Sequence, residues 1–228
     1  MTLITGTLIF AVIALMGMLC ACFWLIKKLQ KLLAEAGNDQ LTGLWLRAKF
    51  LTAVEVLFNA VRAKKFGVSD LHRRRSDEVV ASNEMTVLIF DIDHFKRVND
   101  TFGHLVGDQV LLVLANILKA QCRAGDLVCR WGGEEFLVAL ATDTRGAQFF
   151  YRRVSIAFRH ATKQLIDQEV TVTCGAVQLE SLAQSFDSLV ERADACLYDG
   201  KHGMRDCLVY QSPGSDMKVL YDPMDKPT

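Results

Sequence analysis

The sequence predicts an α/β protein with one mixed or antiparallel central sheet flanked by helices, preceded by a single transmembrane helix. Three observations favour this class. Strand-like and helix-like segments follow one another in the order βααββαβαβ, which mixes hairpin and crossover connections. Residues 3–26 contain no charged side chain. The 228 residues, 51% of them hydrophobic and 23% charged, suit one folded domain with a short appendage and exclude a mainly disordered protein.

The uncharged run over residues 3–26 is long enough to cross a bilayer as a helix. Its rise would be roughly 36 Å, against a hydrocarbon core of about 30 Å. Three lysines follow at once, and the positive-inside rule then places the rest of the chain in the cytoplasm. A cleaved signal peptide would need a basic region before the run, where only two uncharged residues stand. The stretch LCAC at residues 19–22 leaves a lipoprotein cleavage box as an alternative. We therefore predict a membrane helix over residues 1–26.

Residues 27–37 are expected to form a helical stalk, because their leucines share one helical face. This stripe either pairs with a second copy or merely continues the helix out of the membrane. A further helix is predicted over residues 47–65, where apolar side chains recur at helical spacing. Residues 67–84 are polar and locally basic, which is typical of a solvated loop. Contact with the inner leaflet or with an anionic ligand is the alternative for this loop.

The remaining pattern defines a domain over residues 38–212 and a flexible tail over residues 213–228. An unbroken β-prone run, typical of a buried strand, occupies residues 86–90 and ends in two aspartates. The following segments are a helix at 110–118, two strands within 128–141, a helix at 147–164, a strand at 170–179, a helix at 186–202 and a strand at 207–211.

The charge balance and the cysteines exclude several classes of protein. Lys and Arg number 26 and offset 26 Asp and Glu, so no global positive charge favours nucleic acid as a partner. The seven cysteines lie at scattered spacings, with neither a CxxC pair nor a Cys/His zinc pattern. This pattern disfavours a disulfide framework and a structural zinc site, and it favours reduced cytosolic thiols.

Acidic side chains follow two of the predicted strands. Asp91 ends the first core strand, and Glu134 and Glu135 come directly after Gly132 and Gly133. The two glycines allow positive φ and leave no side chain in the path of a bulky anionic ligand. Clustered carboxylates need a cation, and Mg²⁺ prefers oxygen ligands and the phosphates of a substrate. The pattern predicts metal-assisted phosphoryl or nucleotidyl transfer, although acidic residues beside glycine turns also occur on ordinary surfaces.

The segment RWGGEEF at residues 130–136 resembles the hallmark of the GGDEF family of diguanylate cyclases, in its GGEEF form. Further segments resemble the other family motifs in order and spacing. They are DQLTGL at 39–44 with Arg47, DIDHFKRVND at 91–100, GH at 103–104, GD at 107–108, AD at 193–194, LY at 197–198, Lys201 and Arg205. The resemblance covers roughly residues 38–211 and implies a fold similar to nucleotidyl cyclases and polymerase palm domains.

The resemblance implies an enzyme that condenses two GTP molecules into cyclic di-GMP and releases two pyrophosphates. Mg²⁺ or Mn²⁺ would bind the carboxylates of Asp91 and Glu134 and the carbonyl of Ile92. Glu134, Glu135 and Lys96 would be the catalytic residues, with Glu134 accepting the proton and Lys96 stabilising charge on the phosphate. Because one domain binds one GTP, activity requires a homodimer. The expected location is the bacterial inner membrane, with the catalytic domain in the cytoplasm.

The resemblance also implies which residues contact the substrate. Lys201 and Arg205 would hold the outer phosphates. A carboxylate at Asp108 can accept both guanine donors, N1–H and the 2-amino group, while Asn99 bonds elsewhere on the base. Adenine would leave a buried group unpaired, so this pair favours guanine. Two further substrate contacts are implied, Phe95 and His104. A lone histidine is as often structural, which is the alternative for His104.

Arg123 and Asp126 form an RxxD segment five residues before Gly132, as in family members that carry a product-inhibition site. Arg123 can pair with a guanine edge or a phosphate, and Asp126 can accept from guanine. We therefore expect cyclic di-GMP to bind there and restrain turnover. The alternative is a surface ion pair of little energetic weight.

Three residues depart from the family pattern, and none of them is an implied metal ligand. Leu46 and Asp206 stand where Asn is usual, and Met204 stands where Gly is usual. They put in doubt the geometry of the turn near Leu46 and the phosphate contacts of Arg205. A membrane-tethered receptor that binds cyclic di-GMP without making it is the alternative function. The intact motif residues favour the enzyme.

Overall fold

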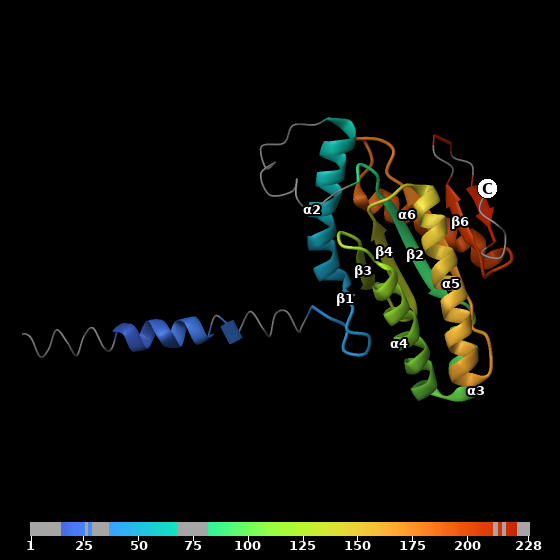
Figure 1. Cartoon of the computed structure of the whole chain (residues 1–228), viewed down its shortest axis with the longest axis horizontal. Coiled ribbons are helices and arrows are strands. Elements are labelled where there is room, and N and C mark those ends of the chain that lie inside the picture. The colour runs from blue at the N-terminus through green and yellow to red at the C-terminus, as the bar shows by residue number, and fades with distance from the viewer. Residues whose placement is uncertain are drawn as a thin grey trace, which may run out of the picture. The chain divides into compact units, whose positions relative to one another are not determined.

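The computed structural model describes residues 15–25, 27–28, 37–67, 82–211, 214–215 and 218–222. The chain divides into two compact units, residues 1–38 and 39–228. In the first unit, residues 15–25 and 27–28 are helical (Figure 1). In the ranges given above, every helix is too short or too polar to cross a membrane. Residues 1–14 and 26 of the predicted membrane helix, 29–36 of the stalk and 68–81 of the basic loop lie outside the described residues.

The second unit is built on one seven-stranded sheet with the spatial order β1-β3-β4-β2-β5-β6-β7. Pairs β1/β3 and β5/β6 are parallel and the other neighbours are antiparallel, which confirms the predicted mixed sheet. The strands are β1 (Trp45–Leu46), β2 (Thr86–Ile92), β3 (Leu127–Arg130), β4 (Glu135–Leu140), β5 (Val172–Gln178), β6 (Leu208–Gln211) and β7 (Lys218–Tyr221).

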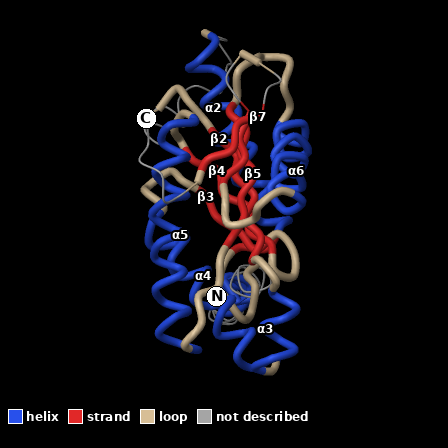
Figure 2. The backbone as a smooth tube through the Cα atoms, turned by 90° about the vertical axis from the view of Figure 1, so that its right-hand side faces the viewer, coloured by secondary structure: helices blue, strands red, loops and turns tan. Residues whose placement is uncertain are grey.

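Helices cover both faces of this sheet, with α4 and α5 on one side and α6 on the other (Figure 2). The helices are α2 (Arg47–Phe66), α3 (Phe95–Phe102), α4 (His104–Gln121), α5 (Thr144–Ile166) and α6 (Phe186–His202). Leu88 and Phe90 of β2 belong to the core that contains α4 and α5. Val87 and Ile89 belong to the core that contains α2 and α6. Because successive side chains of a strand point to opposite faces, a strand buried on both sides is apolar throughout.

The predicted order of elements is confirmed from β2 to β6. Helix α4 begins six residues before the predicted start, because Gly107 and the polar pair Asp108 and Gln109 interrupt the apolar period near its N-terminus. The prediction of a flexible tail was wrong at Lys218–Tyr221, which forms β7 on the edge of β6. Val219 and Tyr221 are half-buried there while Lys218 and Leu220 are exposed, so the strand covers an edge that would otherwise be unpaired.

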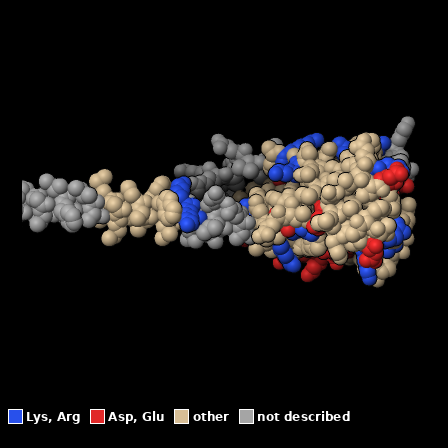
Figure 3. Space-filling view, turned by 90° about the horizontal axis from the view of Figure 1, so that it is seen from below, with Lys and Arg blue, Asp and Glu red and all other residues tan. Residues whose placement is uncertain are grey.

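The surface charge agrees with the balanced composition. On the face seen in Figure 3, acidic and basic side chains both occur and neither sign covers the domain. The sequence likewise contains equal numbers of the two signs. A face of this kind lacks the single-sign field that attracts nucleic acid.

Candidate active site

The acidic site lies where β2 ends and β4 begins, in the middle of the sheet. The two strands are antiparallel neighbours, and the Cα atom of Asp91 pairs with that of Glu135. Burial raises the pKa of Glu134, and the nearby charge of Asp91 raises it further. Burial and the charges of Asp91 and Asp194 likewise raise the pKa of Glu135. The structure therefore brings together the carboxylates that the sequence pattern predicted.

The turn between β3 and β4 uses its glycines differently from the prediction. The backbone N–H groups of Trp131 and Gly132 donate to the Glu135 carbonyl, at 2.8 and 3.3 Å. Neither Gly132 nor Gly133 adopts positive φ, so the turn does not use the conformational freedom that its glycines allow. A Cβ at Gly132 would lie 2.8 Å from Oε2 of Glu135, whereas a Cβ at Gly133 would meet open space. Gly132 makes room for a site carboxylate, and Gly133 leaves the outer surface of the turn open.

Arg130 links this turn to the DQLTGL segment at residues 39–44. Its Nε and Nη2 donate to the carbonyl of Gly133, at 3.1 and 2.6 Å. Its Nη1 donates to both carboxylate oxygens of Asp39, at 3.0 and 3.1 Å. Burial works to raise the pKa of Asp39, but hydrogen bonds from Thr42 and Arg130 outweigh it and hold the pKa below its ordinary value. Two segments about 90 residues apart are thus fixed against each other.

Lys201, near the end of α6, points its ammonium group into the acidic site. Nζ contacts Oδ1 of Asp91 and lies 3.4 Å from the carbonyl oxygen of Ile92 and 3.6 Å from Oδ1 of Asp93. Burial raises the pKa of Asp91, and the Lys201 ammonium offsets part of that shift. Oxygens from three consecutive residues therefore converge on one position that a cation occupies.

These oxygens also fit a magnesium or manganese ion. Hard divalent cations take carboxylate and carbonyl oxygens, and Mg²⁺ usually keeps only one or two protein carboxylates. Asp91 and Ile92 already direct an oxygen each at one cation, and Glu134 lies within electrostatic reach of Asp91. Among the described residues, no group of three or more His, Cys, Asp or Glu side chains is disposed to hold a metal ion. The fit therefore depends on two carboxylates and one carbonyl.

Asp93, which the sequence did not single out, anchors the loop that follows α6. Its carboxylate is buried and accepts from Oγ1 of Thr171 and of Thr173, each at 2.7 Å, and from the backbone N–H of Asp206 at 3.1 Å. Arg205 and Asp206 both adopt left-handed backbone conformations, with φ of 52° and 50°. These bonds hold a strained turn in place and with it the backbone that carries Arg205.

Asp206, one of the departures from the family pattern, forms an ion pair with Arg159 of α5. Burial raises the pKa of Asp206 to about 6, against the lowering effect of the Arg159 charge. An aspartate at this position is thus accompanied by a cation from a neighbouring helix. The sequence alone gave no signal of this pairing, because 47 residues separate the two side chains along the chain.

The predicted base-binding residues lie on α3 and α4. A Cβ at Gly107 would lie 1.9 Å from Oδ1 of Asn99, so the missing side chain makes room for Asn99 against Gly107, the residue before Asp108. Asn99 is half-buried and Asp108 is exposed. His104 and Lys96 are also exposed, at the starts of α4 and α3. Phe95 is 7% exposed and packs in the core with α4 and α5.

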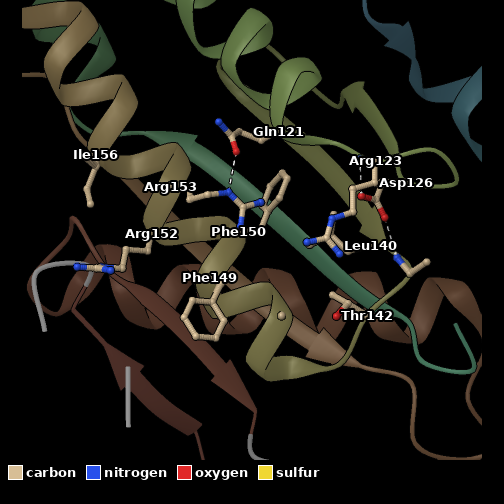
Figure 4. A pocket seen from close by; sticks show the side chains of 12 residues that line it. Gln121, Arg123, Asp126, Leu140, Thr142, Phe149, Phe150, Arg152, Arg153 and Ile156 are labelled. Atoms are coloured by element: carbon tan, nitrogen blue, oxygen red, sulfur yellow. Dashed lines mark hydrogen bonds between the residues drawn. The ribbon is translucent and has the colours of Figure 1, made fainter. Parts of the chain in front are cut away.

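Arg123 and Asp126 line a separate pocket of about 290 Å³ beside α5 (Figure 4). The carboxylate of Asp126 accepts from the backbone N–H groups of Arg123 and Ala141, at 2.8 and 2.9 Å. Asp126 therefore shapes its own loop as well as facing the pocket. Two further arginines line the pocket, Arg152 and Arg153, and could not be predicted because their spacing on α5 gives no local signal.

The comparisons with known proteins agree with this geometry. A family described as "Diguanylate cyclase, GGDEF domain" matches residues 36–207. The chain is 33% identical over 176 residues to diguanylate cyclase DgcP of Pseudomonas aeruginosa, covering 76% of this chain and 24% of DgcP. It is 34% identical over 194 residues to the response regulator PleD of Caulobacter vibrioides, covering 82% of this chain and 38% of PleD. The chain thus spans less than half the length of either relative.

A solved structure gives the same fold. The GGDEF domain of DgcB from Caulobacter crescentus, in complex with c-di-GMP, has a TM-score of 0.62 to this chain at 27% identity. The alignment covers 77% of this chain and 95% of that domain. The family match extends over residues 36–207, well beyond the short motifs themselves, and the chain therefore belongs to the GGDEF domain family of diguanylate cyclases.

Proposed function

We propose that this chain condenses two GTP molecules into cyclic di-GMP with a divalent metal ion. The observation that carries the proposal is the convergence of the Asp91 carboxylate and the Ile92 carbonyl on one cation position, beside Glu134 and Glu135. The membership of the GGDEF family supports the same reaction. Each step would be an in-line attack of a ribose 3′-hydroxyl on an α-phosphate.

Asp91, Glu134 and the Ile92 carbonyl would hold Mg²⁺ or Mn²⁺. When bound, the ion would neutralise charge on the α-phosphate and lower the pKa of the attacking hydroxyl. Glu134 would accept the proton from that hydroxyl. Lys96 would stabilise charge on the reacting phosphate. The surface of Gly133 is open, so a triphosphate can approach the turn without meeting a side chain.

Guanine selection would come from Asn99 and Asp108. The carboxylate of Asp108 can accept from N1–H and from the 2-amino group of guanine, and Gly107, the preceding residue, makes room for Asn99. Adenine has an acceptor at N1 where guanine has a donor, so it would leave the Asp108 carboxylate without that partner. Lys201 and Arg205 would contact the outer phosphates, and Phe95 and His104 would complete the substrate pocket.

Synthesis of a cyclic product from two GTP molecules requires two domains that face each other, so the active form would be a homodimer. We propose that residues 1–26 anchor the chain in the bacterial inner membrane with the domain in the cytoplasm. The uncharged run and the lysines that follow it support this orientation. Confinement to a membrane plane would raise the effective concentration of the partner copy.

Cyclic di-GMP would restrain turnover by binding at Arg123 and Asp126. The pocket beside these residues supports this proposal, because it combines a carboxylate with cationic side chains from α5. A guanine edge can donate to Asp126, and a phosphate can accept from an arginine. The solved complex of DgcB with c-di-GMP shows that a related GGDEF domain binds this nucleotide.

The test is synthesis by the full chain in detergent or nanodiscs, with GTP and Mg²⁺, beside a Glu134→Gln variant. Cyclic di-GMP from the parent and at least roughly 100-fold less from Glu134→Gln is the expected result. The matched control is Glu191→Gln, an exposed carboxylate on α6, which should retain synthesis. Product from neither parent nor variant, with cyclic di-GMP still bound, would instead identify a receptor.

A further inference from the structure

Lys201 stands where the metal ligands converge, although its implied role is to hold an outer phosphate. Its Nζ contacts Oδ1 of Asp91 and the carbonyl oxygen of Ile92, two of the three groups proposed to bind the divalent ion. The side chain of Lys201 is 18% exposed, so it approaches these oxygens from within the domain. An ammonium group and a metal ion cannot both use the same oxygen lone pairs at short range.

From this geometry we infer that the Lys201 ammonium and the divalent ion compete for Asp91 and the Ile92 carbonyl, so that the lysine fills the cation position until the ion displaces it. The inference rests on the proposed metal site. Lys201 would then act as an internal substitute for the ion. Binding of the metal ion would include displacement of the lysine.

Electrostatics explains why a substitute cation is needed. Asp91, Asp93, Glu134 and Glu135 bring four carboxylates to the ends of two adjacent strands. Partly buried like charges repel one another strongly, because the local dielectric constant is well below that of water. The ammonium of Lys201 neutralises part of this charge and thereby stabilises the fold without a metal ion.

The displaced lysine would remain in the site. Asp93 lies 3.6 Å from Nζ of Lys201 and is not among the groups proposed to bind the ion. The Asp93 carboxylate is fixed by Thr171, Thr173 and the backbone of Asp206. It is therefore a rigid partner for the Lys201 ammonium, and the divalent ion does not need it as a ligand. The lysine can therefore leave Asp91 and stay beside Asp93, in reach of the phosphates that arrive with the ion. Metal binding and phosphate binding would then favour each other.

The experiment measures binding of Mn²⁺ alone, without nucleotide, from the electron paramagnetic resonance signal of the free ion. The full chain is compared with Lys201→Met, which keeps an unbranched side chain, one atom shorter, and removes the charge. We expect a dissociation constant roughly tenfold lower for Lys201→Met, which corresponds to about 1.4 kcal/mol of competition. Lys201→Arg keeps the charge and should bind Mn²⁺ about as weakly as the parent.

The matched control is Lys218→Met. Lys218 also pairs with an acid of α6, Asp199 at 2.6 Å, but outside the site. Its removal lowers the net charge equally and should leave Mn²⁺ affinity unchanged. Equal or weaker binding by Lys201→Met overturns the inference, and so does an equal gain in Lys218→Met, which would indicate a general effect of charge.

A second measurement uses the unmutated chain, in case Lys201→Met does not fold. The ¹³Cε signal of Lys201 in ¹³C-lysine-labelled protein, identified with Lys201→Arg, should shift as Mg²⁺ alone is added and saturate with the ion. A signal that does not move overturns the exchange. Failure of the proposed function can be told apart from failure of this inference. In the first case the parent makes no cyclic di-GMP from GTP, whether or not Mn²⁺ displaces the lysine.

Discussion

Arg130 donates from one nitrogen to both carboxylate oxygens of Asp39, while its other two nitrogens donate to the carbonyl of Gly133. One planar guanidinium thus holds the turn of the acidic site and the start of the domain at the same time. Both side chains of the ion pair are 16% exposed, so this pair is far less hydrated than a surface pair. A single point charge could not satisfy three acceptors in these directions.

The first prediction concerns Arg130→Met. It should cost about 2–3 kcal/mol of unfolding free energy, because Asp39 keeps a partly buried charge and the Gly133 carbonyl loses its donor. Synthesis should fall roughly tenfold or more, since the turn that carries Glu134 is no longer held. Urea unfolding and initial rates measure the two effects. Lys163→Met is the control, because Lys163 and Asp167 form an exposed i,i+4 pair, and it should change stability by less than about 0.5 kcal/mol. Parent-like values for Arg130→Met would refute the role of Arg130 in holding the turn.

Leu46 gives a prediction in the stabilising direction. It is the N-cap of α2, with φ of −80° and ψ of 160°, and its side chain makes no capping hydrogen bond. Asparagine, the residue usual at this position in the family, fits the same backbone and can accept from an N–H of the first turn. Leu46→Asn should therefore raise the unfolding free energy by about 1 kcal/mol in urea titrations. Leu46→Ala, which cannot cap, should give no gain, and a gain of equal size in both variants would disprove the capping argument.

Substitution of Gly107 should weaken GTP binding and change the stability of the fold only slightly. Its Cβ would displace the far end of the Asn99 side chain, which is flexible, so Gly107→Ala should change stability by no more than about 1 kcal/mol. The KM for GTP should rise roughly tenfold, because the base then loses a positioned partner. The double variant with Asn99→Ala should be no worse than Asn99→Ala alone. Additive effects in this cycle would show that Gly107 acts by another route.

The acidic site should make stability without metal depend on pH in an unusual direction. Burial and the charge of Asp91 raise the folded-state pKa of Glu134, so the folded protein holds its proton to higher pH than the unfolded chain does. The contribution of Glu134 to stability is then greatest below its unfolded pKa and is lost as pH rises through its folded pKa. In EDTA, Glu134→Gln should raise the melting temperature at pH 7.5, and the gain should shrink near pH 4. A gain that does not change between these pH values would contradict the assignment.

Product inhibition predicts a change in the shape of the progress curve. Arg123→Ala should leave the initial rate unchanged at vanishing product and raise the yield at late times, because cyclic di-GMP no longer slows the enzyme. Time courses of synthesis measure both quantities, and Lys163→Met should reproduce the parent curve. If Arg123→Ala follows the parent curve, the pocket beside α5 has no role in inhibition.

Much of the fold could be predicted because its signals are local. Strand β2 appeared as an apolar run because both of its faces are buried, and Phe186–His202 was predicted with its observed ends because its apolar period is visible in the sequence. Strands β1 and β7 escaped prediction because they are short edges that pairing partners define. The left-handed turn at Arg205 depends on distant hydrogen bonds to Asp93, so no local pattern indicated it.

The residues of the candidate site likewise fall into those with a local sequence signal and those that only distant contacts bring together. Asp91, Glu134 and Glu135 could be predicted because each stands at the end of a strand that the sequence reveals. The contact of Lys201 with Asp91 could not, because 110 residues separate the two along the chain and only the packing of α6 on the sheet joins them. Arg159 and Asp206 meet for the same reason.

The central claim is that Asp91, Glu134 and the Ile92 carbonyl bind one divalent ion in reach of a triphosphate. The most direct test is anomalous diffraction from crystals grown with Mn²⁺ and a non-hydrolysable GTP analogue. We predict one manganese peak within coordination distance of all three groups and of the α-phosphate, with Lys201 withdrawn from Asp91. A peak bound by other side chains, or a triphosphate seated away from the turn at Gly132, would contradict the account.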